Sequence, residues 1–585
     1  MRWLQKLRKR DYADYIGFDE ILVDSGIFVG DDDSRVAVVE RPFSSFSYLL
    51  LFSILLTGGV LLFGRTLYLG SVQGAAFAER STQNHLQREV YTADRGVIYD
   101  RKGRVIVSNS WIPEEERSIR VLSHPVAFSH LIGFVGAPSE KDVKKDAELR
   151  DFEALGRDGV EYTYDEILRG EVGERLQEVD ARGEVISSGF VDPPDAGGNI
   201  QLSIDRELQV TTYTELERII KEQGFKGGAA LLFNAHNGEV LTLVSYPSFD
   251  AGAFSKGITN EEYAELISDA RSPLFNRAIA GTYAPGSTVK PFYATAALHE
   301  GVITPERQIL STDALLIPNP YQPGTFTRFG EFRAQGLVDM RRALAVSSNI
   351  YFYTVGGGYG DIAGLGISRL TAWLQKFHIG EISGIDLSGE KAGQIPDATK
   401  KAERHPEDPI WRLGDTYHSS IGQGDFAITP LQMGVALSLL ANGKELIVPH
   451  VLRAVLSGPE KHMEEKKGIA VALDSAHLQV VKEGMIMTTE IGTAKLLGDL
   501  PYIIAAKSGS AEVGNKLRSH SWLIAYTTDT ADPLGMVFFL EAGPRENNVG
   551  AGVLGYRVLE WITQHGGVDG IMSTEPVAEV GIIAP

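Results

Sequence analysis

One uncharged apolar run near the start of the chain limits what the whole sequence can fold into. It extends from residue 46 to residue 63, and to about residue 69 if Arg65 directs its charged head toward the membrane surface. This length is close to the roughly 20 residues that a helix needs to cross a bilayer. A buried core helix is the alternative, but a run that is apolar all round offers no polar face to solvent. The sequence therefore predicts a transmembrane helix at residues 46–69, after a tail at residues 1–45.

Basic residues on the N-terminal side of this helix indicate which end stays in the cytoplasm. The tail holds seven Lys and Arg residues, which favours keeping it inside. Close to the helix the balance is even, because Arg35 and Arg41 are matched by Arg65 and Arg80 on the other side. A motif at residues 76–78 resembles a signal-peptidase site but lies too far beyond the apolar run for ordinary cleavage. We expect an uncleaved anchor, with the large C-terminal part outside the cytoplasm.

Composition excludes several classes of function for the rest of the chain. The net charge is −20, which argues against nucleic acid as the main partner because phosphate binding needs a basic surface. The absence of cysteine rules out disulfides, thiolate nucleophiles and zinc–cysteine sites. The 13 histidines show no spacing typical of metal ligands. We therefore expect neither a metal nor another cofactor.

Two regions with different patterns follow the apolar run. Residues 70–200 contain short strand pairs, such as residues 95–107 with a turn at Lys102 and Gly103, and predict a membrane-proximal pedestal whose charges form solvated faces and salt bridges. Residues 201–565 form a larger domain, followed by a tail at residues 566–585. A helix at residues 206–223 and a hairpin with its turn at Asn237 and Gly238 begin this domain, and three strands close it at residues 502–506, 521–526 and 536–541. Strands at both ends that enclose a helical middle predict an α/β domain with a mostly antiparallel sheet.

Ser287 and Lys290 form a candidate catalytic pair in this domain. A turn at residues 285–286 delivers Ser287 to a predicted helix start, and Lys290 lies three residues later on the same helix face. A serine hydroxyl is a weak nucleophile unless an adjacent base takes its proton, and an amine with a lowered pKa can be that base. A helix cap followed by a solvated lysine is the alternative. A second copy of the pattern, Ser388 to Lys391, lies among glycines and is expected to be an exposed loop.

Two further motifs follow in the chain. Ser347, Ser348 and Asn349 lie within residues 343–353, a predicted helical stretch that can place a hydroxyl and an amide beside a pocket. At residues 507–510, a lysine, a serine, a glycine and a serine end the apolar strand at residues 503–506, where the glycine allows a substrate backbone to approach closely. Each motif alone has an ordinary structural explanation. Their order, with 60 and 160 residues between successive motifs, makes the set informative.

In this order the motifs resemble the signature of the penicillin-recognising serine enzymes. Flanking segments resemble the class B penicillin-binding proteins in particular, namely residues 95–103, 276–291, 414–424, 429–433, 484–494 and 520–522. The resemblance covers roughly residues 65–560. It implies the penicillin-binding transpeptidase fold, an α+β domain whose antiparallel sheet has helices on both faces, together with an all-helical subdomain.

The resemblance also implies an activity, that of a serine D,D-transpeptidase that cross-links peptidoglycan stem peptides and is acylated by β-lactams. The acyl-enzyme would form at Ser287, with Lys290 as base, Ser347 as proton relay and Asn349 holding the stem peptide. Lys507 would tune the electrostatic field, and backbone N–H groups of Ser287 and Ser510 would form the oxyanion hole. The substrate-binding residues would be Ser508, Gly509 and Ser510. Ser508 stands where threonine is commoner in the family, a change that keeps the hydroxyl.

The same resemblance implies a setting for the enzyme. The protein would be a single-pass bacterial inner-membrane protein with a periplasmic catalytic domain, acting on stem peptides of lipid-linked or nascent glycan strands. No glycosyltransferase domain is recognisable, so we expect a polytopic membrane glycan polymerase as partner within an elongation or division complex.

Two other functions remain open from the sequence. A hydrolase on the same fold, either a D,D-carboxypeptidase or a β-lactamase, is the first. Between Ser347 and Lys507 there is no Glu-x-x-x-Asn spacing of the kind a class A β-lactamase uses for deacylation, whereas a carboxypeptidase fits the motifs. A non-catalytic cell-wall scaffold or β-lactam sensor is the second, and it has no reason to retain all three motifs.

Overall fold

The computed structural model describes residues 44–77, 86–113, 117–145, 149, 154–179, 184–319, 322–456, 461–462, 466–514, 517–547 and 549–573. Most of the predicted N-terminal tail and the last twelve residues of the predicted C-terminal tail lie outside this set. Two compact units are present, one containing the residues before Glu89 together with 176–189, and the other containing the remainder.

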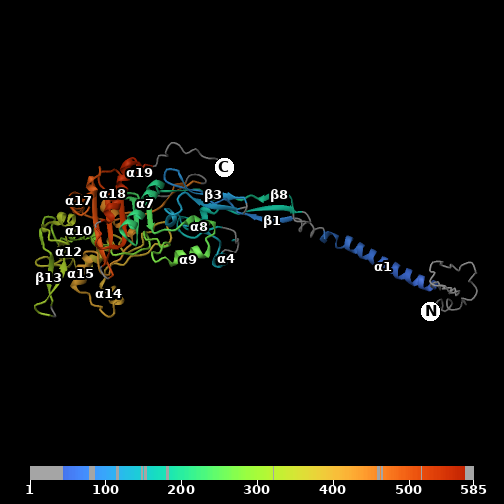
Figure 1. Ribbon diagram of the computed structural model, residues 1–585, viewed down its shortest axis with the longest axis horizontal. Helices are drawn as coiled ribbons and strands as arrows, with labels where there is room; N and C mark the ends of the chain where they lie inside the picture. Colours follow the sequence, from blue (N-terminus) through green and yellow to red (C-terminus); the bar gives the residue numbers. More distant parts are fainter. Residues whose placement is uncertain are drawn as a thin grey trace, which may run out of the picture. The chain divides into compact units, whose positions relative to one another are not determined.

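The first unit contains the predicted apolar helix. Helix α1 (Ser45–Ser71) begins after Ser44, whose side chain accepts a hydrogen bond from the backbone N–H of Ser47. Its 18-residue apolar window has a mean hydropathy of 2.2, and almost all of its side chains are exposed. Among the described residues α1 is the helix that is long and apolar enough to cross a membrane. The predicted apolar helix at residues 46–69 is present within α1, and its length and composition suffice to cross a membrane (Figure 1).

A sheet in the second unit joins the pedestal to the following domain. Its six strands combine pedestal segments with segments from beyond residue 200, in the order β18-β17-β9-β2-β3-β4. The buried Ile98 and Ile200 are direct partners in the parallel pair between β2 and β9. The predicted boundary near residue 200 therefore lies inside one continuous sheet. The strands are β2 (Ile98–Tyr99), β3 (Val105–Ile112), β4 (Arg117–Leu122), β9 (Ile200–Leu202), β17 (Leu452–Val455) and β18 (Lys461–His462).

The remaining pedestal elements are strands of two smaller sheets and four short helices. They are β1 (Leu86–Tyr91), β7 (Gly173–Val179) and β8 (Val185–Asp192) in one three-stranded sheet, the pair β5 (Val135–Gly136) and β6 (Leu155–Gly156), and the helices α3 (Ser129–Ile132), α4 (Glu140–Lys145), α5 (Gly159–Thr163) and α6 (Asp165–Leu168).

The charged residues of the pedestal depart from the expected solvated faces. Salt bridges are present, but several are buried: Arg95 and Arg120 both contact the Glu161 carboxylate, at 2.6 and 2.8 Å, and all three side chains are buried. Arg104 likewise bridges Asp100 and Asp205 at the junction with the next domain. A buried charge is tolerated only when it is paired, so these residues fix the geometry of the pedestal instead of facing solvent.

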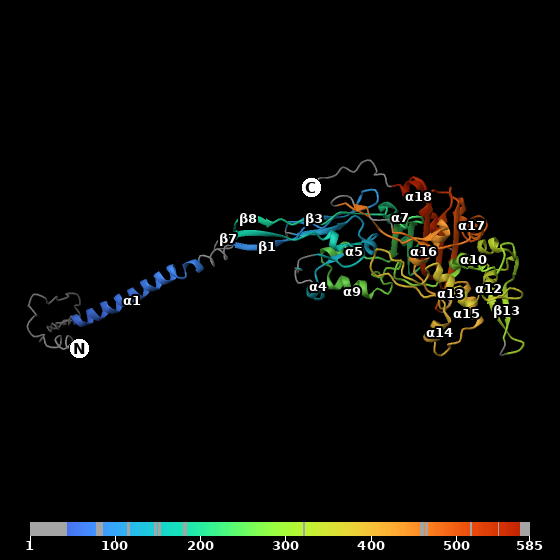
Figure 2. The same cartoon turned by 180° about the vertical axis from the view of Figure 1, so that it is seen from behind.

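The large domain that follows the pedestal is built on a five-stranded antiparallel sheet, as predicted. Alternate residues of each strand enter two separate hydrophobic clusters, so that Leu231 and Ile524 face one side and Leu232 and Leu523 face the other. Helices α7 (Arg206–Gln223) and α18 (Ala551–Gln564) cover the second side, and α10 (Lys290–His299) and α16 (Pro430–Asn442) cover the first (Figures 1 and 2). In the order β11-β10-β22-β21-β20, the strands are β10 (Gly227–Asn234), β11 (Val240–Tyr246), β20 (Ile504–Val513), β21 (Arg518–Thr527) and β22 (Leu534–Pro544).

The fold continues past residue 565, where we expected a tail to begin. Helix α19 (Gly567–Met572) follows α18 (Ala551–Gln564), and its Val568 and Ile571 are buried in the same cluster as α7 (Arg206–Gln223). The 3-10 helix η4 (Lys495–Asp499) also contributes to this cluster, through Leu497.

A mainly helical region lies between β11 and β20. It also contains small two-stranded sheets, which the sequence did not predict: β12 (Ile309–Ser311) with β15 (Gly336–Val338), β13 (Ala314–Pro318) with β14 (Phe326–Gly330), and β16 (Glu445–Leu446) with β19 (Ile469–Ala470). The helices are α8 (Ala251–Lys256), α9 (Asn260–Ser268), η3 (Gly286–Val289), α10 (Lys290–His299), α11 (Met340–Ala345), α12 (Asn349–Gly357), α13 (Gly366–Lys376), α14 (Ala398–Arg404), α15 (Leu413–Ser420), α16 (Pro430–Asn442) and α17 (Ser475–Glu490).

Candidate active site

Ser287 lies in the first turn of a helix, where the sequence placed it. The 3-10 turn η3 carries Ser287 and leads directly into α10, which begins at Lys290. Side chains three residues apart nearly eclipse each other in a 3-10 helix, so Ser287 and Lys290 share one face. Pro291 is accommodated at the start of α10, because its missing N–H falls where helical donors have no intrahelical partner.

The turn that carries Ser287 is held by neighbouring backbone at close range. Gly286 has a φ of +56° and donates its N–H to the carbonyl of Gly422 at 2.9 Å. A Cβ on Gly422 would lie only 2.1 Å from the carbonyl oxygen of Gly286. On the other side, a Cβ on Gly509 would lie 2.9 Å from the Thr288 side chain. Glycine at positions 422 and 509 therefore lets the turn pack directly between the loop after α15 and strand β20.

Ser347 occupies a break in the helix that we predicted at residues 343–353. Helix α11 ends at Ala345 and α12 starts at Asn349, with Ser348 as its N-cap. Ser347 itself has a φ of +60°, a left-handed conformation that is strained for a non-glycine residue. Its Oγ lies 2.9 Å from Lys507 Nζ and 3.3 Å from Lys290 Nζ. The break thus places one hydroxyl between two amines.

Lys290 is anchored by the same segment. Its Nζ donates to the backbone oxygen of Ser347 at 2.7 Å and to Asn349 Oδ1 at 2.8 Å. Lys507 Nζ donates to the backbone oxygen of Ser508 at 2.8 Å. The structure therefore brings four of the five predicted catalytic residues into one hydrogen-bonded group: Lys290, Ser347, Asn349 and Lys507.

Ser287 is the fifth predicted residue, and it adjoins the group without a hydrogen bond to it. Its side chain is half-buried, and its hydroxyl forms no hydrogen bond with any residue that the structure describes. The orientation of Lys290 is accordingly set by Ser347 and Asn349, while Ser287 lies three residues before Lys290 on the same helical turn.

Burial sets the charge state of the two amines. Lys290 is fully buried, and this desolvation lowers its pKa to about 7, against the opposing influence of the Glu331 carboxylate. Burial, together with the adjacent Lys290, also holds the pKa of Lys507 well below its ordinary value. An amine whose pKa is close to neutral is suited to accept and return a proton.

The motif at residues 507–510 lies within β20 and does not end it, contrary to the sequence prediction. The strand continues to Val513 because each of its residues pairs with β21, for example Ser510 with Ser521. Strand β20 is at the edge of the sheet. Ser508 is half-buried and Ser510 is exposed, and Ser508 Oγ lies 2.5 Å from Thr493 Oγ1.

Three residues in contact with this site were not identified from the sequence as site residues. Gly422 and Thr493 belong to segments that the family resemblance had marked, without any role assigned. Glu331 belongs to no recognised motif, although its carboxylate contacts Ser348 at 3.0 Å. The second Ser-x-x-Lys copy forms a non-helical loop, as predicted, and Ser388 donates to Asp158 at 3.1 Å.

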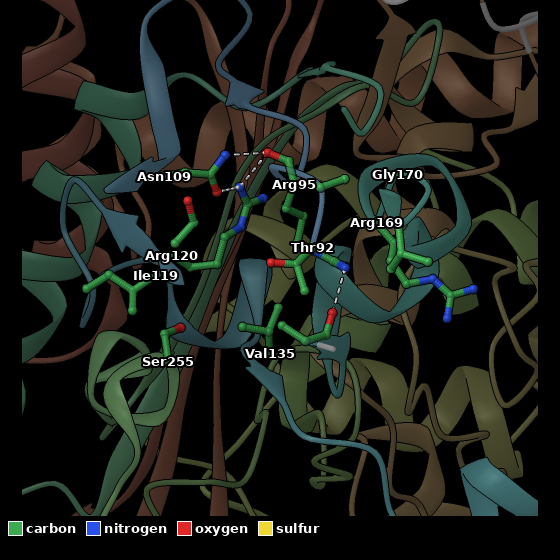
Figure 3. A pocket seen from close by; sticks show the side chains of 13 residues that line it. Thr92, Arg95, Asn109, Ile119, Arg120, Val135, Arg169, Gly170 and Ser255 are labelled. Carbon is green, nitrogen blue, oxygen red and sulfur yellow. Dashed lines mark hydrogen bonds between the residues drawn. The ribbon is translucent and has the colours of Figure 1, made fainter. Parts of the chain in front are cut away.

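Two cavities lie apart from these residues. One of about 110 Å³ is lined by pedestal segments and by Ser255 of α8, with Arg95, Asn109 and Arg120 hydrogen-bonded along its wall (Figure 3). The other, of about 240 Å³, lies beside Lys401 and Trp411. Neither is lined by any of the predicted site residues. The described part of the chain contains no group of three or more His, Asp or Glu residues arranged to hold a metal ion.

Comparison with known proteins agrees with this geometry. A family model described as the penicillin binding protein transpeptidase domain matches residues 228–552, and a penicillin-binding protein dimerisation domain matches residues 112–202. The peptidoglycan D,D-transpeptidase MrdA of Escherichia coli K12 is 33% identical over 445 residues, which are 71% of this chain and 67% of the relative.

Solved structures show the same relationship. The chain superposes on Pseudomonas aeruginosa PBP2, solved in complex with WCK 5153, with a TM-score of 0.68 and 28% identity, covering 82% of this chain and 98% of that one. It also superposes on a chain of a peptidoglycan synthase complex whose structure concerns the coordination of polymerization and crosslinking, with a TM-score of 0.66 and 25% identity over 92% of this chain and 99% of that one. The chain therefore belongs to the class B penicillin-binding proteins and is a D,D-transpeptidase that cross-links peptidoglycan.

Proposed function

We propose that Ser287 is the nucleophile of this transpeptidase and that Lys290 is its base. One observation carries the assignment: the three sequence motifs converge, so that Lys290, Ser347, Asn349 and Lys507 form one hydrogen-bonded group, and Lys290 directly follows the turn that holds Ser287. Neutral Lys290 takes the proton of the Ser287 hydroxyl as the oxygen attacks the carbonyl between the two terminal D-alanines. Ser347, which contacts both amines, passes a proton to the leaving nitrogen, and D-alanine departs.

The second half-reaction uses the same groups in reverse. An amine of a second stem peptide attacks the acyl carbonyl and loses a proton to the relay. The ester bond to Ser287 then breaks, the protonated Lys290 returns a proton to the Ser287 oxygen, and the cross-linked product departs. Lys507 contributes positive potential when it is protonated and holds Ser347 by a 2.9 Å contact. Asn349 already uses its Oδ1 for Lys290 and one amide hydrogen for the Gly330 carbonyl, which leaves the other hydrogen for the stem peptide.

Strand β20 supplies the remaining contacts in this proposal. The backbone N–H groups of Ser287 and Ser510 form the oxyanion hole, in which each donor typically contributes about 3–4 kcal/mol. The backbone nitrogen of Ser510 lies only 3.2 Å from where a Cβ on Gly286 would be, which places it against the nucleophile turn. The hydroxyls of Ser508 and Ser510 bind the substrate carboxylate, and Gly509 keeps the strand close to the turn.

Labelling with a fluorescent penicillin tests the assignment. The native protein should form a covalent adduct, and Ser287→Ala should form none while it keeps the native thermal melting temperature. Labelling of the alanine variant at the native rate would exclude Ser287 as the nucleophile. With a stem-peptide substrate, transfer to an added amine supports the transpeptidase reaction, whereas release of the free acid alone would identify a carboxypeptidase.

We also propose how the protein is placed in the cell. The seven basic residues of the N-terminal segment favour a cytoplasmic N-terminus, with α1 as a single-pass inner-membrane anchor and the catalytic domain in the periplasm. Similarity to a chain of a peptidoglycan synthase complex supports a membrane glycan polymerase as partner. Similarity to MrdA and PBP2 favours the elongation complex over the division complex. A tagged copy imaged in dividing cells tests this choice, and recruitment to the septum alone would contradict it.

A further inference from the structure

We propose that Glu331 is a positioning residue whose carboxylate holds residues 347–349 at the head of α12 and thereby sets how this segment meets Lys290. The inference rests on the proposed function, in which Lys290 is the base. Glu331 follows directly after β14 in the chain and is thus supplied by a hairpin outside the three motifs.

The Glu331 carboxylate binds the start of α12 through one of its oxygens, while the other accepts from the backbone N–H of Phe332. Its Oε2 accepts hydrogen bonds from Ser348 Oγ at 3.0 Å, from the backbone N–H of Ile350 at 3.1 Å and from Ser311 Oγ at 3.2 Å. The N–H of Ile350 is one of the helix-terminal donors without an intrahelical partner, and a negative charge is favoured at this end of a helix. Ser348 in turn caps Tyr351 N at 3.2 Å. One carboxylate therefore fixes both the cap and the first turn.

The residue before Glu331 orients Asn349. The Gly330 carbonyl accepts from Asn349 Nδ2 at 3.3 Å, which turns Asn349 Oδ1 toward Lys290 Nζ at 2.8 Å. Gly330 and Glu331 thus hold the segment through Asn349, Ser348 and Ile350. The two lysines contact the same segment through Ser347 and Asn349. Ser347 needs such support because its positive φ is held only where the surroundings determine it from several sides.

Charge gives Glu331 a second effect on the same site. Among the described residues, it is the acid whose charge raises the pKa of Lys290, opposing burial. Lys507 on β20 is the other charged group facing Lys290. Burial raises the pKa of Tyr353 on α12 above its ordinary value, and the charges of Glu331 and Glu512 raise it further. Because Tyr353 stays neutral in the range of the test below, Lys290 and Lys507 are the groups that respond when the Glu331 charge is removed.

The test compares the acylation rate of full-length variants in detergent with a fluorescent penicillin from pH 5.5 to pH 9. Glu331→Gln removes the charge and should lower the plateau rate roughly ten- to a hundredfold, because a small displacement of catalytic groups has effects of that size. The acidic limb is the part of the pH–rate profile in which protonation of Lys290 lowers the rate. Glu331→Gln should move this limb to lower pH, because the lost charge no longer raises the pKa of Lys290. Glu331→Asp keeps the charge, so its plateau should fall while its limb stays at the native position. Asp313→Asn removes an exposed acid of the same hairpin and serves as the matched control, with native rate and native limb.

Superimposable acidic limbs for Glu331→Gln and the native protein would overturn the role of the charge, and a native plateau for Glu331→Gln would overturn the positioning role. If the melting temperature shows that Glu331→Gln does not fold, Ser348→Ala decides instead. It removes the contact to the cap and keeps the charge, so a lower rate with a native limb supports the proposal and a native rate overturns it. Labelling of Ser287→Ala would refute the proposed function itself, and this outcome is distinct from either failure at Glu331.

Discussion

Replacing Gly422 by alanine should displace the nucleophile turn without touching any chemical group of the site. The added Cβ would lie 2.1 Å from the carbonyl oxygen of Gly286 and 2.8 Å from the backbone nitrogen of that residue. Ordinary contact between such atoms is about 3.5 Å, so the turn has to retreat by roughly 1 Å. Both partners are backbone, and no side-chain rotation can relieve the overlap. A displacement of this size costs on the order of 100-fold in rate.

Gly424→Ala provides a matched control two residues away. Gly424 has a φ of +78° and Gly422 a φ of +74°, so alanine carries the same left-handed strain of about 1–2 kcal/mol at either position. A Cβ on Gly424 would meet nothing closer than 3.8 Å, at His418. The two variants therefore share the loss of stability from strain and differ in the clash with Gly286.

The assay is the second-order rate of covalent labelling by a fluorescent penicillin, with thermal unfolding of the same samples. Gly424→Ala should label within about threefold of the native rate, and Gly422→Ala about 100-fold more slowly, with both folded at the assay temperature. Equal labelling rates for the two variants would refute the reasoning, because they would show that the contact between residues 286 and 422 does not set the position of Ser287.

Three further predictions follow from the same structure. Acylation of the native protein should rise as pH increases through about 7, since below its pKa Lys290 is protonated and cannot take the Ser287 proton; a rate independent of pH between 6 and 8 would contradict this. Ser347→Ala removes the hydroxyl between the two amines and should slow labelling roughly 10²- to 10⁴-fold with an unchanged melting temperature, whereas near-native labelling would exclude a relay at this position. Glu161→Gln removes the carboxylate of the buried Arg120 and one of the two carboxylates of the buried Arg95, which keeps Asp165, and should cost about 3–5 kcal/mol in denaturant unfolding. The exposed Glu166→Gln should change stability by less than about 0.5 kcal/mol, and equal losses for both variants would contradict the argument.

The sequence predicted those parts of the fold that local patterns determine. The hairpin of β10 and β11 has its Asn237–Gly238 turn, and helix α7 begins after Asp205 and ends at Gly224, as capping preferences require. The continuous apolar runs in β21 and β22 predicted strands, and they are continuous because both faces of this sheet are buried beneath helices. The three motifs were also recognisable, since each is a short pattern of chemically distinctive residues.

Other features depend on contacts between distant segments and leave no local pattern. Residues 343–353 are apolar on either side of Ser347, Ser348 and Asn349 and predicted one continuous helix, but the contacts of Lys290, Lys507 and Glu331 hold residues 347–348 in a break. Strand β20 continues through a serine- and glycine-rich segment of weak strand propensity, because β21 pairs with it along its full length. Glu331 directly follows a small hairpin and belongs to no recognisable motif, and its partners at positions 348 and 350 are identified only by the tertiary structure.

The charge balance at Lys290 shows why these supports matter for the chemistry. Burial alone disfavours the ammonium form, and the nearby Lys507 disfavours charging both amines together. A carboxylate in direct contact with Lys290 would restore the charge and remove the base. The Glu331 carboxylate instead binds Ser348 and Ile350. Lys290 is hydrogen-bonded to Ser347 and to the side-chain amide of Asn349. The charge of Glu331 raises the pKa of Lys290 only part of the way, to about 7, where the amine can both take a proton from Ser287 and give it up within one catalytic cycle.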